Sequence, residues 1–157
     1  MTAKRTVKHF TVSGMQDTDR LAKLLQKNRW FSELPQDVLD EMLALARVRT
    51  LTDGEFVYAK DDQPDGLYGV ISGAARISNI GPDGREAVLA VLTPGSWFGE
   101  ISLFDGLPRS HDTIASGNTE LLMIPRVGFQ QILERRPELD PLFMKLLCRR
   151  IRISFAM

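Results

Sequence analysis

The sequence contains few cysteines and histidines and has no formal net charge. The single cysteine, Cys148, excludes a disulfide framework or an all-cysteine iron–sulfur site within the chain. Basic and acidic residues number 20 each, so the formal net charge is zero, and the chain as a whole is not a nucleic-acid-binding polycation. Basic residues gather only locally, at Lys4, Arg5 and Lys8 near the start and at Arg149, Arg150 and Arg152 near the end.

Long apolar runs are missing as well. No run approaches the roughly 20 residues that span a bilayer. The basic N-terminal residues are not followed by the apolar stretch of a secretory signal. We therefore expect a cytoplasmic protein that has no membrane partner.

Motifs of catalysis are also absent. The two histidines, His9 and His111, lie far apart in unlike contexts, whereas metal-dependent enzymes built on a double-stranded β-barrel need clustered histidines and a carboxylate. Neither a phosphate-binding nor a dinucleotide-binding glycine loop is present, and no side chain has the setting of an activated nucleophile. The sequence therefore predicts neither an enzyme nor a metal site.

The length and the 43% share of hydrophobic residues suit one domain with a real core, covering residues 1–157. The hydrophobic pattern divides this domain into a helical lead-in over about 1–46, a β region over 47–125 and C-terminal helices over 126–157. In the lead-in, "DTDRLAKLLQKNRWF" and "SELPQDVLDEMLALA" have apolar residues at helical spacing. Pro35 stands where a first-turn proline is tolerated.

The middle region changes to short apolar or alternating runs. Examples are "LYGVIS", "AARISNI", "EAVLAVL" and "LLMIP", separated by turn signals such as Gly73, the "GPDG" of 81–84 and Gly117-Asn118. Several short strands at this spacing predict an antiparallel sandwich or jelly roll. The expected fold is mainly β, with helices on either side of the β region.

The last region returns to helix and ends in a wide apolar stripe. The stripe contains Leu139, Leu142, Phe143, Leu146, Leu147, Ile151 and Ile153. A stripe this wide favours pairing with a partner helix, most simply the same helix of a second copy. The alternative is a terminal helix that packs on its own barrel.

The segment "FGEISLFDGLPRS", residues 98–110, combines Glu100 and Arg109 with glycine, proline and apolar residues. Arg109 offers a fork of donors that matches two oxygens of a phosphate. A Glu100 carboxylate beside a phosphate is unfavourable, because both are negative, unless the carboxylate accepts a hydrogen bond. A sugar hydroxyl supplies that hydrogen bond. A phosphate next to a free ribose hydroxyl satisfies both groups, and the alternative is a Glu100–Arg109 salt bridge with no ligand.

The other residues of the segment fit a phosphate as well. Gly99 allows close approach of the backbone just before Glu100. One helical turn over "EISLF" would leave the N–H groups of Ile101 and Ser102 free for an anion. Ser110 adds a hydroxyl and a further N–H.

This segment closely resembles the phosphate-binding cassette of cyclic nucleotide-binding domains. The resemblance implies that Glu100, after Gly99, holds the ribose 2′-hydroxyl. It implies that Arg109 holds the cyclic phosphate, assisted by Ser110 and by the backbone of Ile101 and Ser102. The similarity extends over "DGEFVYAKDDQPDGLYGVISGAARIS" and "LTPGSWFGEISLF" and covers about residue 28 to the end. The ligand that it implies is cAMP or a related cyclic nucleotide.

The end of the chain, "LLCRRIRIS", resembles the long dimer helix of bacterial regulators related to the catabolite activator protein and the fumarate–nitrate regulator. The resemblance implies a homodimer through the helix from Leu139 to Met157. It also implies that Ser154 reaches the base of the nucleotide. DNA would be bound only through a domain that is absent from this chain. The alternative is a family fold with a vestigial pocket, which acts as a dimerisation module or senses another small ligand.

Two residues depart from the pattern of the family. Asp61 stands where many members have glycine, a small change because aspartate tolerates a positive φ. His111 follows Arg109-Ser110, where a small residue is typical. Its imidazole would crowd the phosphate, add a second cationic contact or point away from the pocket.

Overall fold

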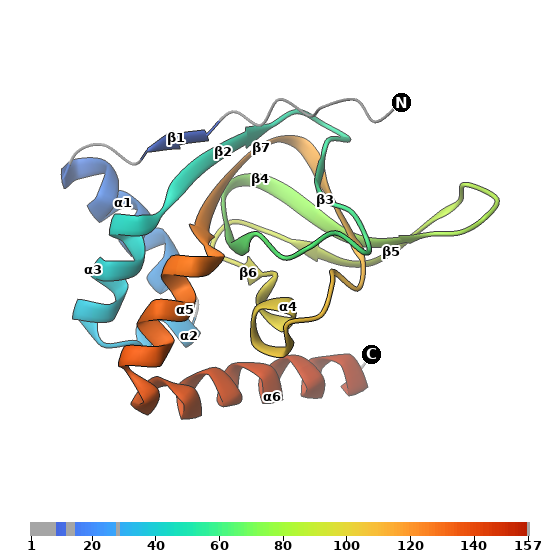
Figure 1. Cartoon of the computed structure of the whole chain (residues 1–157). Helices are drawn as coiled ribbons and strands as arrows, with labels where there is room; N and C mark the ends of the chain where they lie inside the picture. Colours follow the sequence, from blue (N-terminus) through green and yellow to red (C-terminus); the bar gives the residue numbers. More distant parts are fainter. Residues whose placement is uncertain (1–8, 12–14, 28, 157) are drawn as a thin grey trace.

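The computed structural model of the chain describes residues 9–11, 15–27 and 29–156 (Figure 1). The basic cluster of Lys4, Arg5 and Lys8 and the terminal Met157 lie outside these residues. A curled antiparallel sheet occupies the middle of the molecule, with α1, α2, α3 and α5 beside one end of it and α6 running below (Figure 1). The predicted fold class, mainly β with flanking helices and a long C-terminal helix, is confirmed.

The elements follow one another in the order helices, strands, helices that the hydrophobic pattern predicts. The helices are α1 (Met15–Gln26), α2 (Arg29–Ser32), α3 (Gln36–Leu45), α4 (Glu100–Asp105), α5 (Arg126–Arg135), the 3-10 turn η1 (Pro137–Leu139) and α6 (Asp140–Ala156). The strands are β1 (His9–Thr11), β2 (Arg47–Leu51), β3 (Phe56–Tyr58), β4 (Gly66–Ile80), β5 (Glu86–Leu92), β6 (Trp97–Phe98) and β7 (Asp112–Pro125).

One strand lies inside the predicted helical lead-in, which is a correction to that prediction. β1 pairs antiparallel with β2, with Phe10 opposite Val48. Three residues are too few to show a period in the sequence, so only the pairing partner makes this segment a strand. From Met15 to Leu45 the lead-in is helical as predicted, within the described residues.

Two long strands, β4 and β7, pair with each other over most of their length and hold the rest of the sheet. The first half of β4 also pairs with β6 and its second half with β5. β7 likewise pairs with β3 near its start and with β2 near its end. Each long strand therefore changes neighbour partway along, which curls the sheet into the jelly-roll form.

Gly73 is the point at which β4 bends. Its φ is +75°, and a Cβ there would meet Asn118 O at 2.3 Å. The register with β7 shifts between Val70 and Ser72 and again across Gly73, as at a β-bulge. The sequence signal at Gly73 predicts a turn between two strands, whereas the chain forms one bent strand because the pairing with β7 resumes beyond it.

The buried hydrophobic residues form two clusters on either side of the sheet wall. One lies inside the curled sheet and includes Tyr58, Tyr68, Phe98 and Leu121. The other joins the helices to the sheet and includes Phe31, Met42, Trp97, Phe129 and Phe143. Trp97 and Phe98 are neighbours in β6 and serve one cluster each, because successive side chains of a strand point to opposite faces.

Three aromatic rings join α4 to α5 and α6. The Phe104 ring of α4 lies 5.3 Å from the Phe143 ring of α6 and 6.1 Å from the Phe129 ring of α5, between centroids. Each such pair contributes about 0.5–1.5 kcal/mol beyond the area that it buries. The short helix α4 is therefore fixed to both C-terminal helices through its own side chain.

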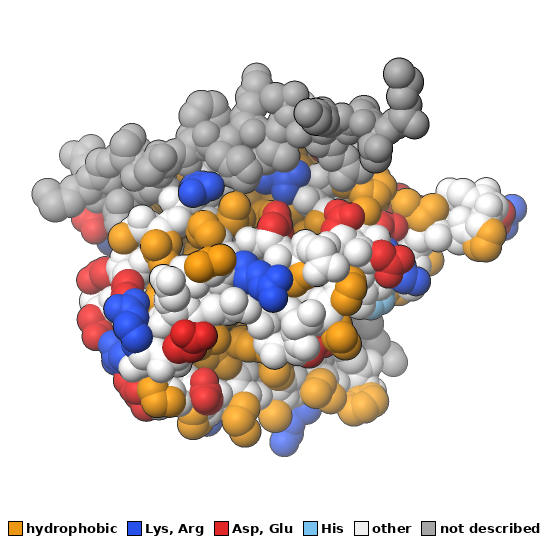
Figure 2. Space-filling view, in the orientation of Figure 1, with side chains coloured by type: hydrophobic (Ala, Val, Ile, Leu, Met, Phe, Trp, Pro, Cys, Tyr) orange, Lys and Arg blue, Asp and Glu red, His pale blue; other side chains and the backbone are white. Residues whose placement is uncertain are grey.

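The predicted C-terminal apolar stripe divides between two surroundings, which corrects the prediction that all of it pairs with a partner helix. Leu139, Phe143 and Leu146 are buried in the chain's own core, as in the alternative of a terminal helix that packs on its own barrel, and other apolar side chains of α6 are exposed. Met144, Ile151, Ile153 and Phe155 have exposed fractions of 62%, 53%, 63% and 86%. Hydrophobic side chains gather along this lower edge of the molecule in Figure 2. Among the residues that the structure describes, no helix is long and apolar enough to cross a membrane.

Candidate functional site

A pocket opens where α4, the loop that follows it, the sheet and α6 meet. Tyr58 and Ile77 line it from β3 and β4, and Arg150 lines it from α6. Six of the seven predicted site residues line the same pocket: Gly99, Glu100, Ile101, Ser102, Arg109 and Ser110. The structure thus brings together all the predicted site residues with the exception of Ser154.

Gly99 sets the start of α4. Its φ of +87° belongs to the left-handed region, where glycine is favoured. A Cβ at this position would lie 3.0 Å from Arg109 Nη1 and 3.4 Å from Gly66 O. The absence of a side chain therefore lets the guanidinium of Arg109 pass directly under the first turn of α4, as the sequence predicts for a close approach.

Arg109 is held rigidly in the wall of the pocket, with an exposed fraction of 2%. Its Nη1 donates to Gly99 O at 2.7 Å, and its Nη2 donates to Gly66 O at 2.8 Å and to Asp65 Oδ1 at 3.1 Å. The guanidinium also lies over the Tyr58 ring, 4.1 Å from its centroid. Its buried Nε has no hydrogen-bond partner in the described part of the chain. The N–H of Nε is thus unused by the described residues and available to a group that enters the pocket.

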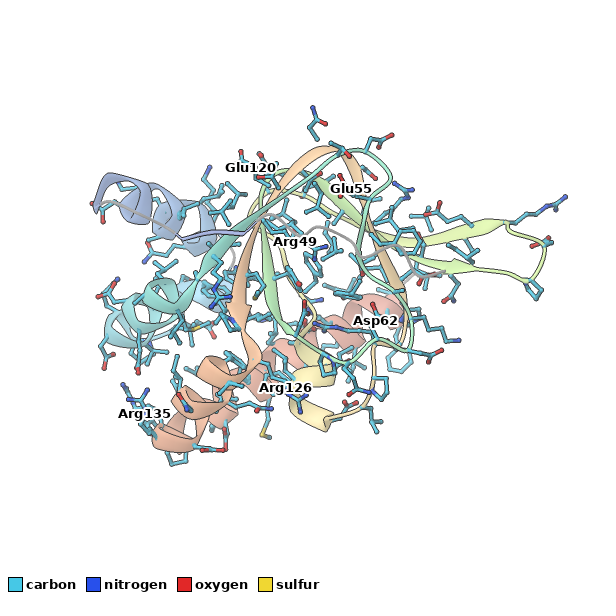
Figure 3. All side chains as sticks on the ribbon, turned by 45° about the horizontal axis from the view of Figure 1, so that its top comes forward. Arg49, Glu55, Asp62, Glu120, Arg126 and Arg135 are labelled. Atoms are coloured by element: carbon cyan, nitrogen blue, oxygen red, sulfur yellow. The ribbon has the colours of Figure 1, made fainter. Side chains whose placement is uncertain are left out.

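The main chain at Arg109 is fixed to the loop between β3 and β4. Arg109 N donates to Asp62 O, and Asp61 N donates to Arg109 O, each at 2.8 Å. Asp61 has a φ of +72°, so aspartate takes the left-handed conformation at this position, as the sequence suggests. Asp62 lies in the same loop beside the curled sheet (Figure 3). Two loops that are distant in sequence therefore hold the arginine in place.

A chain of polar contacts continues from Arg109 through the exposed Asp65 to the buried Tyr68 and Arg49. Asp65 accepts from Tyr68 Oη at 2.6 Å, and Tyr68 Oη accepts from Arg49 Nη1 at 3.3 Å. Arg49 lies among the strands in Figure 3 and also donates to Val57 O at 2.6 Å. Burial raises the pKa of Tyr68, which keeps its hydroxyl protonated as the donor to Asp65.

Glu100 is the buried carboxylate of the site, with an exposed fraction of 1%. Its Oε1 lies 3.0 Å from Arg150 Nε. Neither carboxylate oxygen accepts a well-formed hydrogen bond from the residues that the structure describes. Burial raises the pKa of Glu100, and the charge of Arg150 opposes that rise. A buried acceptor of this kind is satisfied by a donor that enters from outside.

The ligand-free alternative, a salt bridge between Glu100 and Arg109, is not what the structure contains. Arg109 pairs with Asp65, and Glu100 pairs with Arg150. Each charge therefore has a structural partner of its own, and both still face the pocket.

The serines of the segment have different surroundings. Ser102 is buried, and its hydroxyl donates to Pro108 O at 3.3 Å, which ties α4 to the loop after it. Ser110 is exposed, and its Oγ lies 2.8 Å from Nδ1 of His111. His111 is among the residues that line the pocket, and the placement of its ring relative to a phosphate stays a prediction.

Ser154 is the predicted residue that lies elsewhere. It is exposed on α6, and its hydroxyl donates to Arg150 O one turn earlier at 3.1 Å. The prediction for Ser154 involved the pocket of a second copy, so its contact with a nucleotide stays a prediction.

Among the residues of the site that were not predicted from the sequence, Tyr58, Asp65 and Arg150 contact Arg109 or Glu100. Asp65 lies in the "DDQPDG" turn and Tyr58 in a short strand, and nothing local relates either to Arg109. Arg150 belongs to the C-terminal basic cluster, in which Arg149, one position before, pairs with Glu33 instead. The signal for Arg150 was the charge cluster, but helix rotation decides which arginine faces the pocket.

Comparison with known proteins identifies the family of the chain. The family model for the cyclic nucleotide-binding domain matches residues 48–136, more than half of the sequence. The chain is 34% identical over 122 residues to the cyclic AMP receptor protein of Thermus thermophilus, covering 78% of this chain and 56% of that protein. It is 33% identical over 99 residues to a CRP-like cAMP-activated global transcriptional regulator of Mycobacterium tuberculosis, covering 63% of this chain and 44% of that protein. The chain thus spans about half the length of the curated relatives that it matches.

A solved structure agrees with these matches. The crystal structure of the Thermus thermophilus catabolite activator protein superposes with a TM-score of 0.69 at 32% identity, covering 81% of this chain and 60% of that one. The resemblance read from the cassette is confirmed. The chain belongs to the cyclic nucleotide-binding domain family and is similar to bacterial regulators of the catabolite activator type.

Proposed function

We propose that this chain is the cAMP-sensing part of a bacterial transcription regulator, with the nucleotide bound in the pocket beside α4. The observation that carries the proposal is the state of Arg109. It is buried and fixed by Gly66, Gly99 and Asp65, yet its Nε has no partner in the described part of the chain, and Arg109 is one of the residues that line the pocket. A preorganised cation with a spare donor suits an anionic group, and a phosphate is its natural partner.

The phosphate lies against Arg109 in this proposal. Ser110 is within the same pocket wall and offers its hydroxyl. Ile101 and Ser102 follow Glu100 in the first turn of α4, where backbone N–H groups have no acceptor within the helix. These groups add neutral donors to the charge of the guanidinium.

The ribose lies against Glu100. The carboxylate is buried and accepts no well-formed hydrogen bond from the described residues, so a hydroxyl donor improves its surroundings directly. The ribose 2′-hydroxyl is such a donor and stands next to the phosphate in a cyclic nucleotide. A ligand that presents both groups at once satisfies Glu100 and Arg109 together.

The link from the ligand to the rest of the protein runs through α6. Arg150 pairs with Glu100 and also donates to Trp97 O, so the helix is attached to two walls of the pocket. Phe143, earlier in α6, packs on Phe104 of α4. A ligand that changes the position of α4 therefore changes contacts of α6.

The exposed face of α6 is the proposed dimer surface. Two copies that pair along the helix from Leu139 to Met157 would bury Met144, Ile151 and Phe155, which lie on one side of α6 and are exposed in one copy. In such a parallel dimer Ser154 would approach the base of a nucleotide in the partner's pocket. The dimer would carry the signal to DNA through a domain outside this chain.

The relatives favour cAMP and regulation over catalysis. Two of them are named as cAMP-dependent regulators, a cyclic AMP receptor protein and a cAMP-activated transcriptional regulator. By this similarity the chain acts in the cytoplasm, where a regulator meets DNA, and binds its ligand without transforming it.

Isothermal titration of the chain with cAMP tests the proposal, with cGMP and AMP as comparison ligands. We expect saturable binding of cAMP with one site per chain and weaker binding of AMP, which lacks the cyclic phosphate. Absence of cAMP binding would favour the alternative, a dimerisation module with a vestigial pocket or a sensor of another small ligand.

A further inference from the structure

His111 is the one imidazole that lines the pocket among the described residues, and it sits directly behind a proposed phosphate contact. Its Nδ1 lies 2.8 Å from Ser110 Oγ. Ser110 in turn lines the pocket next to Arg109. The imidazole is therefore hydrogen-bonded to a hydroxyl that belongs to the proposed phosphate site.

The proton on Nδ1 of the ring decides what the hydroxyl can offer, and in the neutral ring its presence depends on the tautomer. A serine hydroxyl has a single proton to donate, and a neutral imidazole that accepts at Nδ1 takes that proton away from the phosphate. In the imidazolium form both ring nitrogens donate, so Ser110 Oγ accepts from His111 and its own proton is free for the ligand. Protonation also adds a positive charge close to the cyclic phosphate, which carries one negative charge, and charge-assisted hydrogen bonds are the stronger ones.

The other charged and titratable groups of the pocket come from several elements. Tyr58 contributes a phenol from β3, Glu100 a carboxylate from α4, and Arg109 and Arg150 contribute guanidinium groups from the loop and α6. Asp112, the neighbour of His111 on β7, accepts from Lys60 N at 2.8 Å. Guanidinium groups keep their charge throughout the physiological range, and burial raises the pKa of both Tyr58 and Glu100. Glu100 is thus the other group whose protonation can change in mildly acidic solution.

We propose that His111 makes ligand binding proton-linked: protonation of its ring, acting through the Ser110 hydroxyl, increases the affinity of the pocket for the phosphate. The inference rests on the proposed function, since it concerns how the same pocket holds a nucleotide. Its consequence is a sensor whose affinity for the nucleotide rises as the pH falls. His111 is a positioning residue in this scheme, because it acts on the ligand through Ser110.

The test is calorimetric titration with cAMP at several pH values, in pairs of buffers that differ in ionisation enthalpy. For the wild-type chain we expect net proton uptake on binding near neutral pH. We also expect a dissociation constant about 3–10-fold lower at about pH 5.5 than at about pH 8, the range over which histidine ordinarily changes charge. His111→Gln keeps a side chain that can hydrogen-bond but cannot take up a proton, and should bind cAMP with no net uptake. His9→Gln, the same change at the chain's other histidine, is the matched control and should behave as the wild type.

Two further variants test which groups cause the proton uptake. Ser110→Ala removes the relay and should abolish most of the proton uptake, and full uptake in this variant would overturn the route through the hydroxyl. Glu100→Gln removes the second titratable group and should leave the uptake in place. The inference fails if wild type and His111→Gln change in affinity by the same factor across the pH range. If no variant and no wild-type chain binds cAMP at any pH, the proposed function itself fails, which is a different result.

Discussion

The guanidinium of Arg150 on α6 lies 3.0 Å from the carboxylate of Glu100 in the first turn of α4. The two residues are far apart in sequence, and this pair joins the C-terminal helix to the candidate pocket. Glu100 is almost fully buried, whereas the Arg150 side chain keeps 30% of its exposure. Loss of the pair would therefore cost more free energy at the carboxylate than at the arginine. A buried charge without a partner is costly, whereas the exposed part of Arg150 is solvated by water.

Replacing Arg150 by alanine should destabilise the chain in a pH-dependent way. Burial raises the pKa of Glu100 and Arg150 opposes this rise, so the variant has a still higher pKa at Glu100. A carboxyl whose pKa is higher in the folded than in the unfolded chain loses folding free energy as it ionises, as the pH rises through its folded pKa. We expect a loss of about 1–3 kcal/mol at neutral pH, below the full cost of breaking a buried pair because Arg150 is partly exposed.

Urea denaturation at several pH values measures this effect. The deficit of Arg150→Ala should shrink as the pH falls toward about 4.5, the ordinary value for a glutamate in an unfolded chain. Arg149→Ala is the matched control, since Arg149 pairs with the part-exposed Glu33 and should cost less than about 1 kcal/mol at every pH. Equal and pH-independent losses in the two variants would contradict the role given to the Glu100–Arg150 pair.

Arg109→Ala should remove cAMP binding and also lower stability. The lost contact to a phosphate corresponds to about 2–5 kcal/mol, or roughly 30-fold to several thousand-fold in affinity. The same side chain donates to Gly66 O, Gly99 O and Asp65, which lose their donor in the variant. Titration calorimetry and thermal unfolding measure the two effects. Arg85→Ala, at a position whose side chain is 91% exposed, should change neither. Unchanged affinity of folded Arg109→Ala for cAMP would remove the cassette from the binding scheme.

The sequence predicted the cassette because its residues are local. Gly99, Glu100, Arg109 and Ser110 lie within one segment, and their chemistry can be read without knowing the rest of the fold. Arg150 and Asp65 come from distant segments and reach the pocket only after the sheet has curled and α6 has packed against α4. Such contacts depend on the rotation of a helix and the length of a loop, which residue patterns do not encode one by one.

The positions of the strand ends also depend on tertiary contacts that the sequence pattern does not encode. The runs before and after Gly73 have strand character, and a glycine between two such runs is typical of a turn. The continuous pairing of β4 with β7 overrides that signal, so the glycine becomes a bulge within one strand. The predicted turn at Gly117-Asn118 fails for the same reason, since it lies within β7. Sequence patterns locate a bend in both strands, and the tertiary partner decides whether the strand ends there.

Glu100→Gln should weaken cAMP binding less than Arg109→Ala does. An amide oxygen still accepts from a ribose hydroxyl, so the loss is the charge assistance of about 1–2 kcal/mol. The 2′-deoxy analogue of cAMP should bind the wild type more weakly than cAMP and should be nearly insensitive to this substitution. Comparing the four titrations as a cycle isolates the contact between Glu100 and the hydroxyl. Equal binding of the ribose and deoxyribose ligands to the wild type would contradict it.

An acidic residue in the exposed apolar face of α6 should dissociate the proposed dimer. Ile151→Glu would place two like charges near the two-fold axis of a parallel pair, which costs several kcal/mol when they are buried. A dimer with a dissociation constant of about 1 μM or lower would then become largely monomeric at working concentrations. Sedimentation velocity over a range of concentrations measures the change. Val88→Glu on β5 is the matched control, because Val88 is 51% exposed and Ile151 is 53% exposed. A wild-type chain that stays monomeric at high concentration would remove the dimer, and with it the approach of Ser154 to a partner's nucleotide.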